Sequence, residues 1–124
     1  MLRSFQLVAL LVLGACTTST SDVSPAQYYR PAGAGPQWKI TGDLQSEYTE
    51  DMFGTTVQRT LHVYIDGERV VTGQLSPMAT GELSGQYKGL PVDTVCTSEQ
   101  KTPTWIDVRC MVLVDNERAA TLTF

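Results

Sequence analysis

The chain has 124 residues, of which 42% are hydrophobic, and it carries a formal net charge of −4. The hydrophobic content indicates a folded chain rather than a disordered one, and the length allows a single domain. Because Lys and Arg are few and scattered, the chain lacks the basic surface of a nucleic-acid-binding protein, and we expect no nucleic acid among its partners.

Residues 1–15 have the three parts of an export signal. Arg3 precedes an apolar stretch, Phe5 to Leu13, which is interrupted only by Gln6 and followed by two small residues. The apolar stretch is about half as long as the roughly 20 residues of a membrane-spanning helix. We therefore predict a cleaved signal peptide over residues 1–15.

The segment Leu13-Gly14-Ala15-Cys16 resembles the lipobox of bacterial lipoproteins. The resemblance implies that the chain is cut before Cys16, that the Cys16 thiol carries a diacylglycerol and that the new amino terminus is acylated. Several acyl chains hold a protein on a membrane almost permanently, since each buried CH₂ contributes about 0.8 kcal/mol. Thr17 follows the anchor, which implies the outer membrane, with the domain facing the periplasm or the cell surface. An ordinary secretory signal, with Cys16 unmodified, is the alternative.

The next segment, residues 16–36, is rich in Ser, Thr and Pro and ends near Ala32-Gly33-Ala34-Gly35. Such a composition buries little apolar surface, so we predict a lipidated flexible tether. Tyr28 and Tyr29 interrupt its polarity. They either dock on the domain, wait for a partner or face solvent.

Residues 37–124 show period-two alternation, β-branched residues and glycine-containing turns, and no helical periodicity of useful length. We predict an all-β domain, a small antiparallel meander of six to seven strands that forms a barrel or a sandwich. Hairpin turns are expected at three dipeptides, Asp66-Gly67, Lys88-Gly89 and Asp115-Asn116. The expected strands are Trp38–Leu44, Thr55–Ile65, Glu68–Leu75, Gly81–Tyr87, Leu90–Thr97, Trp105–Val114 and Glu117–Phe124.

The stretch Cys110 to Val114 is apolar without alternation. A strand of this kind is typically covered on both faces, so we expect it to be central in its sheet. The Tyr28–Tyr29 region or Trp38 is a candidate cover for the second face. A contact with another copy of the chain in an oligomer is the other candidate cover. The sequence leaves the oligomeric state open.

Cys96 and Cys110 are an even pair in an exported chain once Cys16 is lipidated, and we predict a disulfide between them. Their midpoint falls at Pro103, within a polar, turn-like segment. Pairing of the two strands about this turn sets Cys96 opposite Cys110, Thr94 opposite Val112 and Val92 opposite Val114. Closing a ring of this length contributes about 3 kcal/mol in the chain-entropy description.

We find no catalytic, metal or cofactor motif and expect neither an enzyme nor a cofactor. The single histidine, His62, is predicted on the polar, solvated face of a strand. Serine-hydrolase and zinc sites need more partners than His62 has in the sequence. Acidic residues Glu47, Glu50 and Asp51 fall in a predicted loop, Gln45–Gly54, and lack the regular spacing of a calcium loop.

The segment Leu83 to Gly89 contains Ser84, Gly85 and Tyr87. It resembles the Ser-Gly loop, ending near a Tyr, of membrane-bound lysozyme inhibitors, although the spacing is one residue short and the segment has the pattern of a strand. The resemblance implies insertion into an enzyme cleft. The competing interpretation takes Gly81, Gly85 and Gly89 as bend and turn residues of a curved sheet.

These observations predict a cell-envelope lipoprotein whose β-domain has a structural or partner-binding role. The alternative is a lipid-anchored inhibitor of a lytic enzyme such as lysozyme or a protease. The candidate partners are therefore the membrane, through the lipid, and an envelope protein or lytic enzyme. Five residues are candidates for partner contact: Tyr48, Glu50, Asp51, Ser84 and Tyr87.

Overall fold

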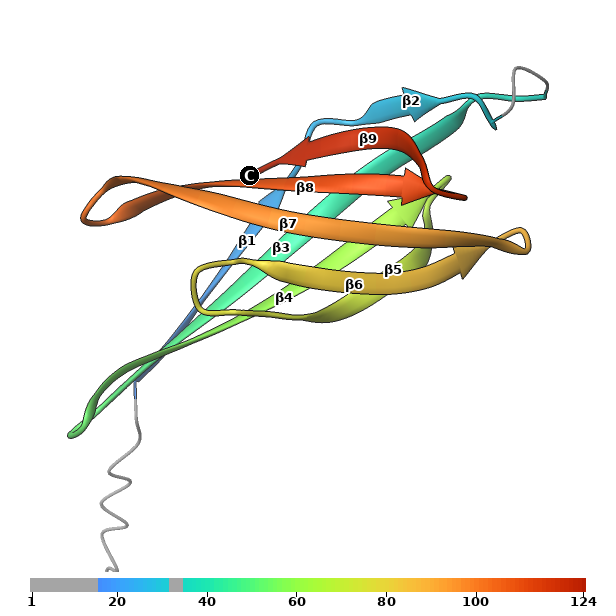
Figure 1. Ribbon diagram of the computed structural model, residues 1–124. Coiled ribbons are helices and arrows are strands. Elements are labelled where there is room, and N and C mark those ends of the chain that lie inside the picture. The colour runs from blue at the N-terminus through green and yellow to red at the C-terminus, as the bar shows by residue number, and fades with distance from the viewer. Residues whose placement is uncertain (1–15, 32–34) are drawn as a thin grey trace, which may run out of the picture.

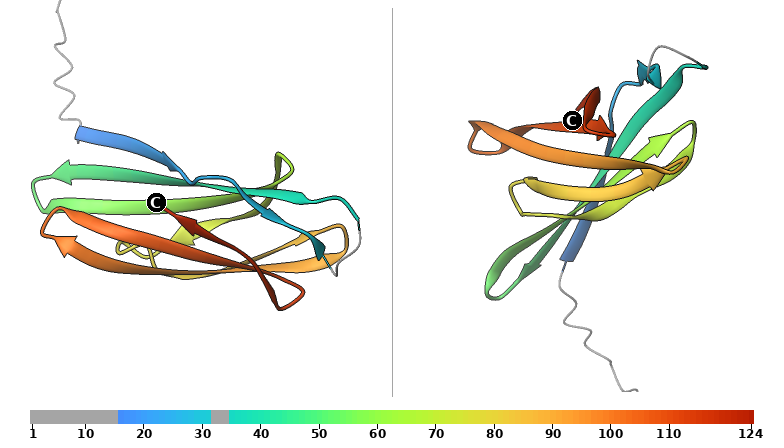
Figure 2. Two further views of the ribbon diagram at one scale, coloured as in Figure 1. Left: turned by 90° about the horizontal axis from the view of Figure 1, so that it is seen from above. Right: turned by 45° about the vertical axis from the view of Figure 1, so that its right-hand side comes forward.

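A computed structural model describes residues 16–31 and 35–124 of the protein. The predicted signal peptide, residues 1–15, lies outside the described residues. The described chain forms two antiparallel sheets packed as a β-sandwich (Figures 1 and 2). The strands are β1 (Cys16–Val23), β2 (Gln27–Tyr29), β3 (Trp38–Asp51), β4 (Gly54–Ile65), β5 (Glu68–Leu75), β6 (Gly81–Tyr87), β7 (Leu90–Thr102), β8 (Trp105–Val114) and β9 (Glu117–Thr123).

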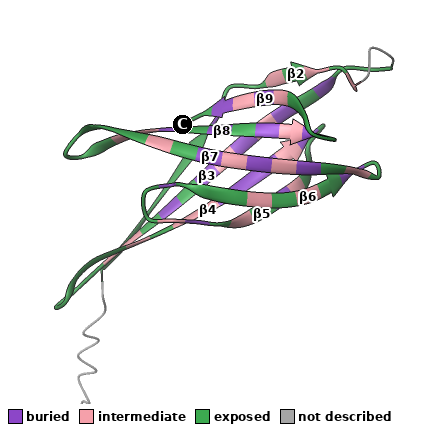
Figure 3. Ribbon diagram, in the orientation of Figure 1, coloured by how far each residue is buried: buried purple, intermediate pink, exposed green. Residues whose placement is uncertain are grey.

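The first sheet has the order β1-β3-β4-β5, with β2 also paired to β3, and the second has the order β6-β7-β8-β9. In the strands that form the core, such as β4 and β8, alternate residues point between the sheets, which confirms the predicted period of two there. In β4, for example, Leu61, Val63 and Ile65 are fully buried, and Val92, Cys110 and Val112 face them from the second sheet. Figure 3 shows the buried residues as bands across the strands. The all-β antiparallel fold is confirmed, as a sandwich.

The three predicted hairpin turns are confirmed. Asp66 and Gly67 have φ angles of 50° and 80°, and Lys88 and Gly89 have 50° and 77°. Asp115 and Asn116 have 50° and 64°. Positive φ at both central positions gives the backbone twist that tight antiparallel hairpins need.

The prediction of a flexible tether over residues 16–36 is wrong for the residues that form β1 and β2. Strand β1 pairs along its whole length with β3, from Cys16 opposite Glu50 to Val23 opposite Asp43. Every residue of β1 is exposed, so no apolar alternation marked it in the sequence. Backbone pairing to the long edge of β3, rather than side-chain burial, holds this strand. These two strands raise the total above the predicted six to seven.

The predicted loop Gln45–Gly54 is also wrong. Strand β3 continues to Asp51 and pairs with β4 down to Asp51 opposite Gly54, which leaves only Met52 and Phe53 in the turn. The side chains of this outer half are mostly polar on both faces. For that reason the hydrophobic pattern in the sequence ended at Leu44, whereas the backbone pairing of β3 with β4 continues to Asp51.

Strand β8 lies inside its sheet, between β7 and β9, as predicted. Double coverage of the stretch Cys110 to Val114 is not found, because Met111 is 37% exposed while its two neighbours are buried. Trp38 does not cover this strand. It packs in the core, edge-on to Tyr87 at 4.9 Å and to Tyr29 at 6.0 Å between ring centroids.

Candidate partner-binding groove

A groove opens between the two sheets on the side where β3 ends, β4 begins and the β7–β8 hairpin turns. Its volume is about 780 Å³. We call it the inter-sheet groove. Its lining residues are Asp22, Leu44, Tyr48, Val57, Arg59, Pro77, Met78, Gln100, Pro103, Thr104, Trp105, Ile106, Val108 and Phe124.

The groove exists because the outer halves of β3 and β4 continue the inward-facing register past the packed core. Tyr48 and Val57 are directly paired, and both are only half-buried. On the opposite wall, Trp105 at the start of β8 is 61% exposed, and Met78 between β5 and β6 is 46% exposed. Large apolar side chains thus line a concave surface that the fold itself does not fill.

Arg59 brings a fixed positive charge into this groove. Its Nη1 donates to Ser46 Oγ at 2.7 Å, and its Nε donates to the Pro77 carbonyl at 2.7 Å. The guanidinium carbon lies 5.7 Å from the centroid of the Tyr48 ring. These contacts hold the guanidinium in place before any partner arrives, so binding would cost little side-chain entropy.

The five predicted contact residues do not form one site. Tyr48 lines the inter-sheet groove, whereas Glu50 and Asp51 are exposed at the end of β3. Ser84 and Tyr87 lie in β6, a strand of the other sheet.

Neither β6 residue offers a contact like the one that the lysozyme-inhibitor resemblance implied. Ser84 Oγ donates to Asp93 Oδ1 at 2.8 Å within the sheet. Tyr87 is 7% exposed, and its hydroxyl donates to Asp66 Oδ2 at 3.3 Å, so its selection as a contact residue is wrong. Burial, and then the charge of Asp66, raises the pKa of Tyr87. Gly85 is a packing residue, because a Cβ there would collide with the carbonyl oxygen of Val70.

His62 is buried, at 7% exposure, so the predicted solvated position is wrong. It does lie on the outer face of the first sheet, but its Nδ1 is 3.0 Å from Thr72 Oγ1 and its ring is 6.4 Å from that of Tyr64. Burial and the charge of Arg69 lower the pKa of His62, and Asp43 opposes them. His62 is therefore a buried ring with a hydroxyl partner, which is a structural role in the first sheet.

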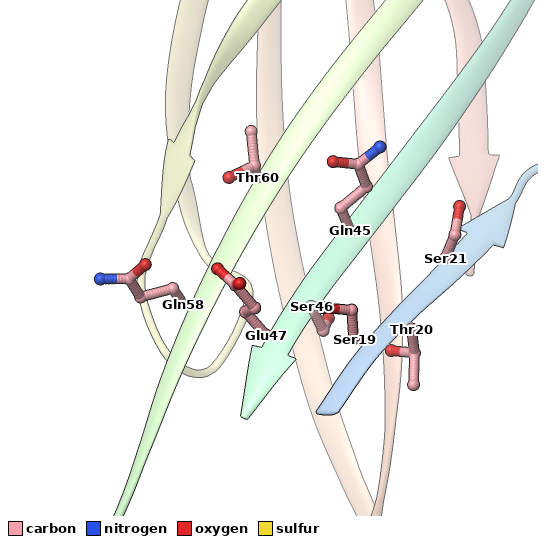
Figure 4. A pocket seen from close by; sticks show the side chains of 8 residues that line it. All are labelled: Ser19, Thr20, Ser21, Gln45, Ser46, Glu47, Gln58 and Thr60. Carbon is pink, nitrogen blue, oxygen red and sulfur yellow. The ribbon is translucent and has the colours of Figure 1, made fainter. Parts of the chain in front are cut away.

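A second hollow lies on the outer face of the first sheet, across β1, β3 and β4 (Figure 4). Its volume is about 390 Å³. Hydroxyl and amide side chains line it, with Glu47 as the single ionisable group: Ser19, Thr20, Ser21, Gln45, Ser46, Glu47, Gln58 and Thr60. A lone carboxylate among hydroxyls lacks the second acid or base that general acid–base hydrolysis uses.

The predicted disulfide is present among residues 16–31 and 35–124. Cys96 and Cys110 are bonded, in the predicted register, and Cys16 is free and exposed at the first residue of β1. Among these residues we find no group of three or more His, Cys, Asp or Glu side chains placed to hold a metal. The same part of the chain has no helix with the length and apolar character needed to cross a bilayer.

The sequence pattern missed the groove because its walls come from strands far apart in the chain. Arg59 has the same parity as Val57 and Leu61 in its strand, but no local motif marked it, and Met78 fell between two predicted strands. Trp105 carried the one local signal, a large aromatic directly after the Pro103-Thr104 turn. Comparison with protein-family models, curated proteins and solved structures found no match to this chain.

Proposed function

We propose that the protein is a non-enzymatic lipoprotein of the cell envelope, anchored to the outer membrane through Cys16, and that its sandwich binds another envelope protein in the inter-sheet groove. The observation that carries the binding role is the composition of the groove. It combines Trp105, Tyr48 and Arg59, and these three residue types dominate the binding energy of protein–protein interfaces. Met78 adds an adaptable apolar contact.

The anchoring half of the proposal has two supports. Cys16 follows the lipobox-like segment in the sequence, and it is exposed at the beginning of β1. The Cys96–Cys110 disulfide fits an exported protein, because disulfides persist in oxidising compartments.

The residues that suggested the inhibitor alternative do not have the exposed arrangement that it requires. A buried Tyr87 and a Ser84 bonded within its sheet do not form a protruding loop. We therefore favour a partner in the groove over an enzyme cleft that receives the segment Leu83 to Gly89.

Mass spectrometry of the mature amino terminus tests the anchor. The proposal expects a cleaved chain that begins at a diacylated, N-acylated Cys16, and it expects globomycin to block the cleavage. An unlipidated amino terminus, or processing insensitive to globomycin, would contradict it.

Site-specific photo-crosslinking in intact cells tests the groove. A photoreactive side chain at Trp105 or Met78 should capture one discrete envelope protein. The same probe at Gln86, which is exposed on β6 outside the groove, is the matched control. Absence of a product at the groove positions across growth conditions, or equal products at Gln86, would overturn the binding role.

A further inference from the structure

The β3–β4 hairpin ends in two adjacent apolar side chains that nothing in the described chain covers. Met52 is 89% exposed and Phe53 is 91% exposed. We call Met52 and Phe53 the hairpin tip. Single exposed apolar residues are ordinary, but two neighbouring ones at the end of a projecting hairpin form a contact surface.

The tip has a defined backbone conformation. Asp51 is opposite Gly54 at the last pair of the ladder, and the Asp51 carboxylate accepts from the Phe53 amide at 2.8 Å. Gly54 has a φ of 124°. Asp at the first position and Gly at the fourth are typical of a tight turn, so the two apolar side chains are presented by a formed hairpin.

The tip lies beside the residue that the proposed function assigns to the lipid. Cys16 is directly opposite Glu50 in the β1–β3 ladder, and Met52 follows Glu50 by two residues, just past the end of β3. At the usual rise of a strand, the tip extends roughly 7 Å beyond Cys16. Figures 1 and 2 show β1 beginning next to this hairpin.

We propose that the hairpin tip is a second membrane contact, which inserts Met52 and Phe53 into the same leaflet that holds the acyl chains of Cys16. This inference rests on the proposed lipid anchor. Interfacial elements bury apolar side chains about 5–10 Å into the boundary between headgroups and acyl chains, a depth that the roughly 7 Å offset matches. The acyl chains of Cys16 and the hairpin tip together fix the orientation of the domain relative to the membrane, with β1, β3 and β4 extending away from the bilayer.

The charges beside the tip select the kind of lipid surface. Glu50 and Asp51 are exposed directly next to it, and no Lys or Arg lies between Gln45 and Gln58 in the sequence. Anionic headgroups would repel these carboxylates. The tip therefore fits a zwitterionic surface, and anionic lipid should make its insertion shallower, with added salt reversing that effect.

Electron paramagnetic resonance on the lipidated, full mature protein tests the inference. A nitroxide is placed on Met52→Cys, and the protein is reconstituted in vesicles of phosphatidylethanolamine and phosphatidylcholine. We expect this label to lose collisions with an aqueous nickel chelate and to keep collisions with oxygen. The same label on Gln86→Cys, on a strand of the other sheet, should remain open to the chelate.

A second pair of variants tests whether the protection of position 52 from the chelate depends on the apolar side chain of Phe53 rather than on the label itself. Phe53→Ser should restore chelate collisions at position 52, whereas Phe53→Leu should not. The amino-terminal peptide of each sample is checked for its acyl chains by mass spectrometry.

The outcomes distinguish the inference from its premise. Acylated protein whose position-52 label stays as open to the chelate as position 86 overturns this inference and leaves the anchor standing. Spin–spin broadening at position 52 would show that a second copy of the chain, rather than lipid, covers the tip, and it would also overturn the inference. An unacylated peptide overturns the anchor and the inference together.

Discussion

Gly85 is a residue whose lack of a side chain decides how the two sheets meet. Strands β5 and β6 belong to different sheets, and a Cβ at position 85 would overlap the carbonyl oxygen of Val70 and touch Val71. Backbone cannot move aside as a side chain can. We expect Gly85→Ala to lower the free energy of unfolding by about 2–3 kcal/mol, as overpacking of a core does. Urea denaturation of the oxidised protein measures this.

Gly73→Ala is the matched control for that substitution. An added Cβ at position 73 would meet the end of the Leu83 side chain, which has rotamers available to it. The loss should therefore be clearly smaller than for Gly85→Ala. Equal losses would show that the close approach at Val70 does not limit the fold.

His62 should give the protein a pH-dependent stability. Burial lowers its pKa in the folded state below the value of about 6.5 found in an unfolded chain, so the unfolded state binds the proton more tightly. The stabilisation is complete above pH 6.5 and is lost as the pH falls through the folded-state pKa. We expect the free energy of unfolding to decrease as the pH falls from about 6.5 through the folded-state pKa of His62.

His62→Gln provides the comparison, because glutamine can accept from or donate to Thr72 but does not titrate. Its free energy of unfolding should vary less over that range than that of the wild type. Parallel pH profiles for the two proteins would show that the burial of His62 does not govern the dependence.

At the scale of elements, the β7–β8 hairpin is held by one covalent bond in its interior. Cys96 and Cys110 are directly opposite and separated by 14 residues in sequence. The bond limits the unfolded ensemble, and the Cys96→Ala, Cys110→Ala double variant should lose about 3 kcal/mol of unfolding free energy. Denaturation of this variant measures the loss, and thiol titration of the oxidised wild type should find neither residue free. An unchanged stability would contradict this account.

The elements that the sequence predicted well are those in which side-chain burial and turn chemistry agree. Strands β5, β6 and β8 have the predicted bounds, because each is a run of strand-forming residues between turn-like segments. Strand β1 and the outer half of β3 could not be predicted in this way. Their pairing depends on backbone hydrogen bonds between polar segments, and such bonds leave no mark on hydrophobic periodicity.

The candidate site was less predictable than the fold for a related reason. Tyr48 was identified as a contact residue, but Arg59, Met78 and Trp105 join it only when two sheets are packed together. Tyr87 was misassigned because local resemblance carries no information about burial. A binding surface assembled from several strands is a property of register and packing, which a single sequence does not reveal.

At the scale of the whole molecule, the amino-terminal segment connects the two sheets. Gln27 in β2 pairs with β3 of the first sheet, while its side-chain amide bonds to β9 of the second. Its Oε1 accepts from the Thr121 amide at 2.7 Å, and its Nε2 donates to the Thr121 carbonyl. Nearby, Tyr29 donates its hydroxyl to Glu117. The segment expected to be a tether thus closes one edge of the sandwich.

Gln27→Ala should therefore weaken the whole domain. It removes two hydrogen bonds, each contributing about 0.5–1.5 kcal/mol, so we expect a loss of about 2 kcal/mol in unfolding free energy. The Thr121 amide, which loses its partner, should exchange with solvent deuterium faster than in the wild type. Gln74→Ala, at an exposed position of β5, is the control and should change neither quantity. If both variants behaved like the wild type, the Gln27 side chain would make no energetic contribution to the sandwich.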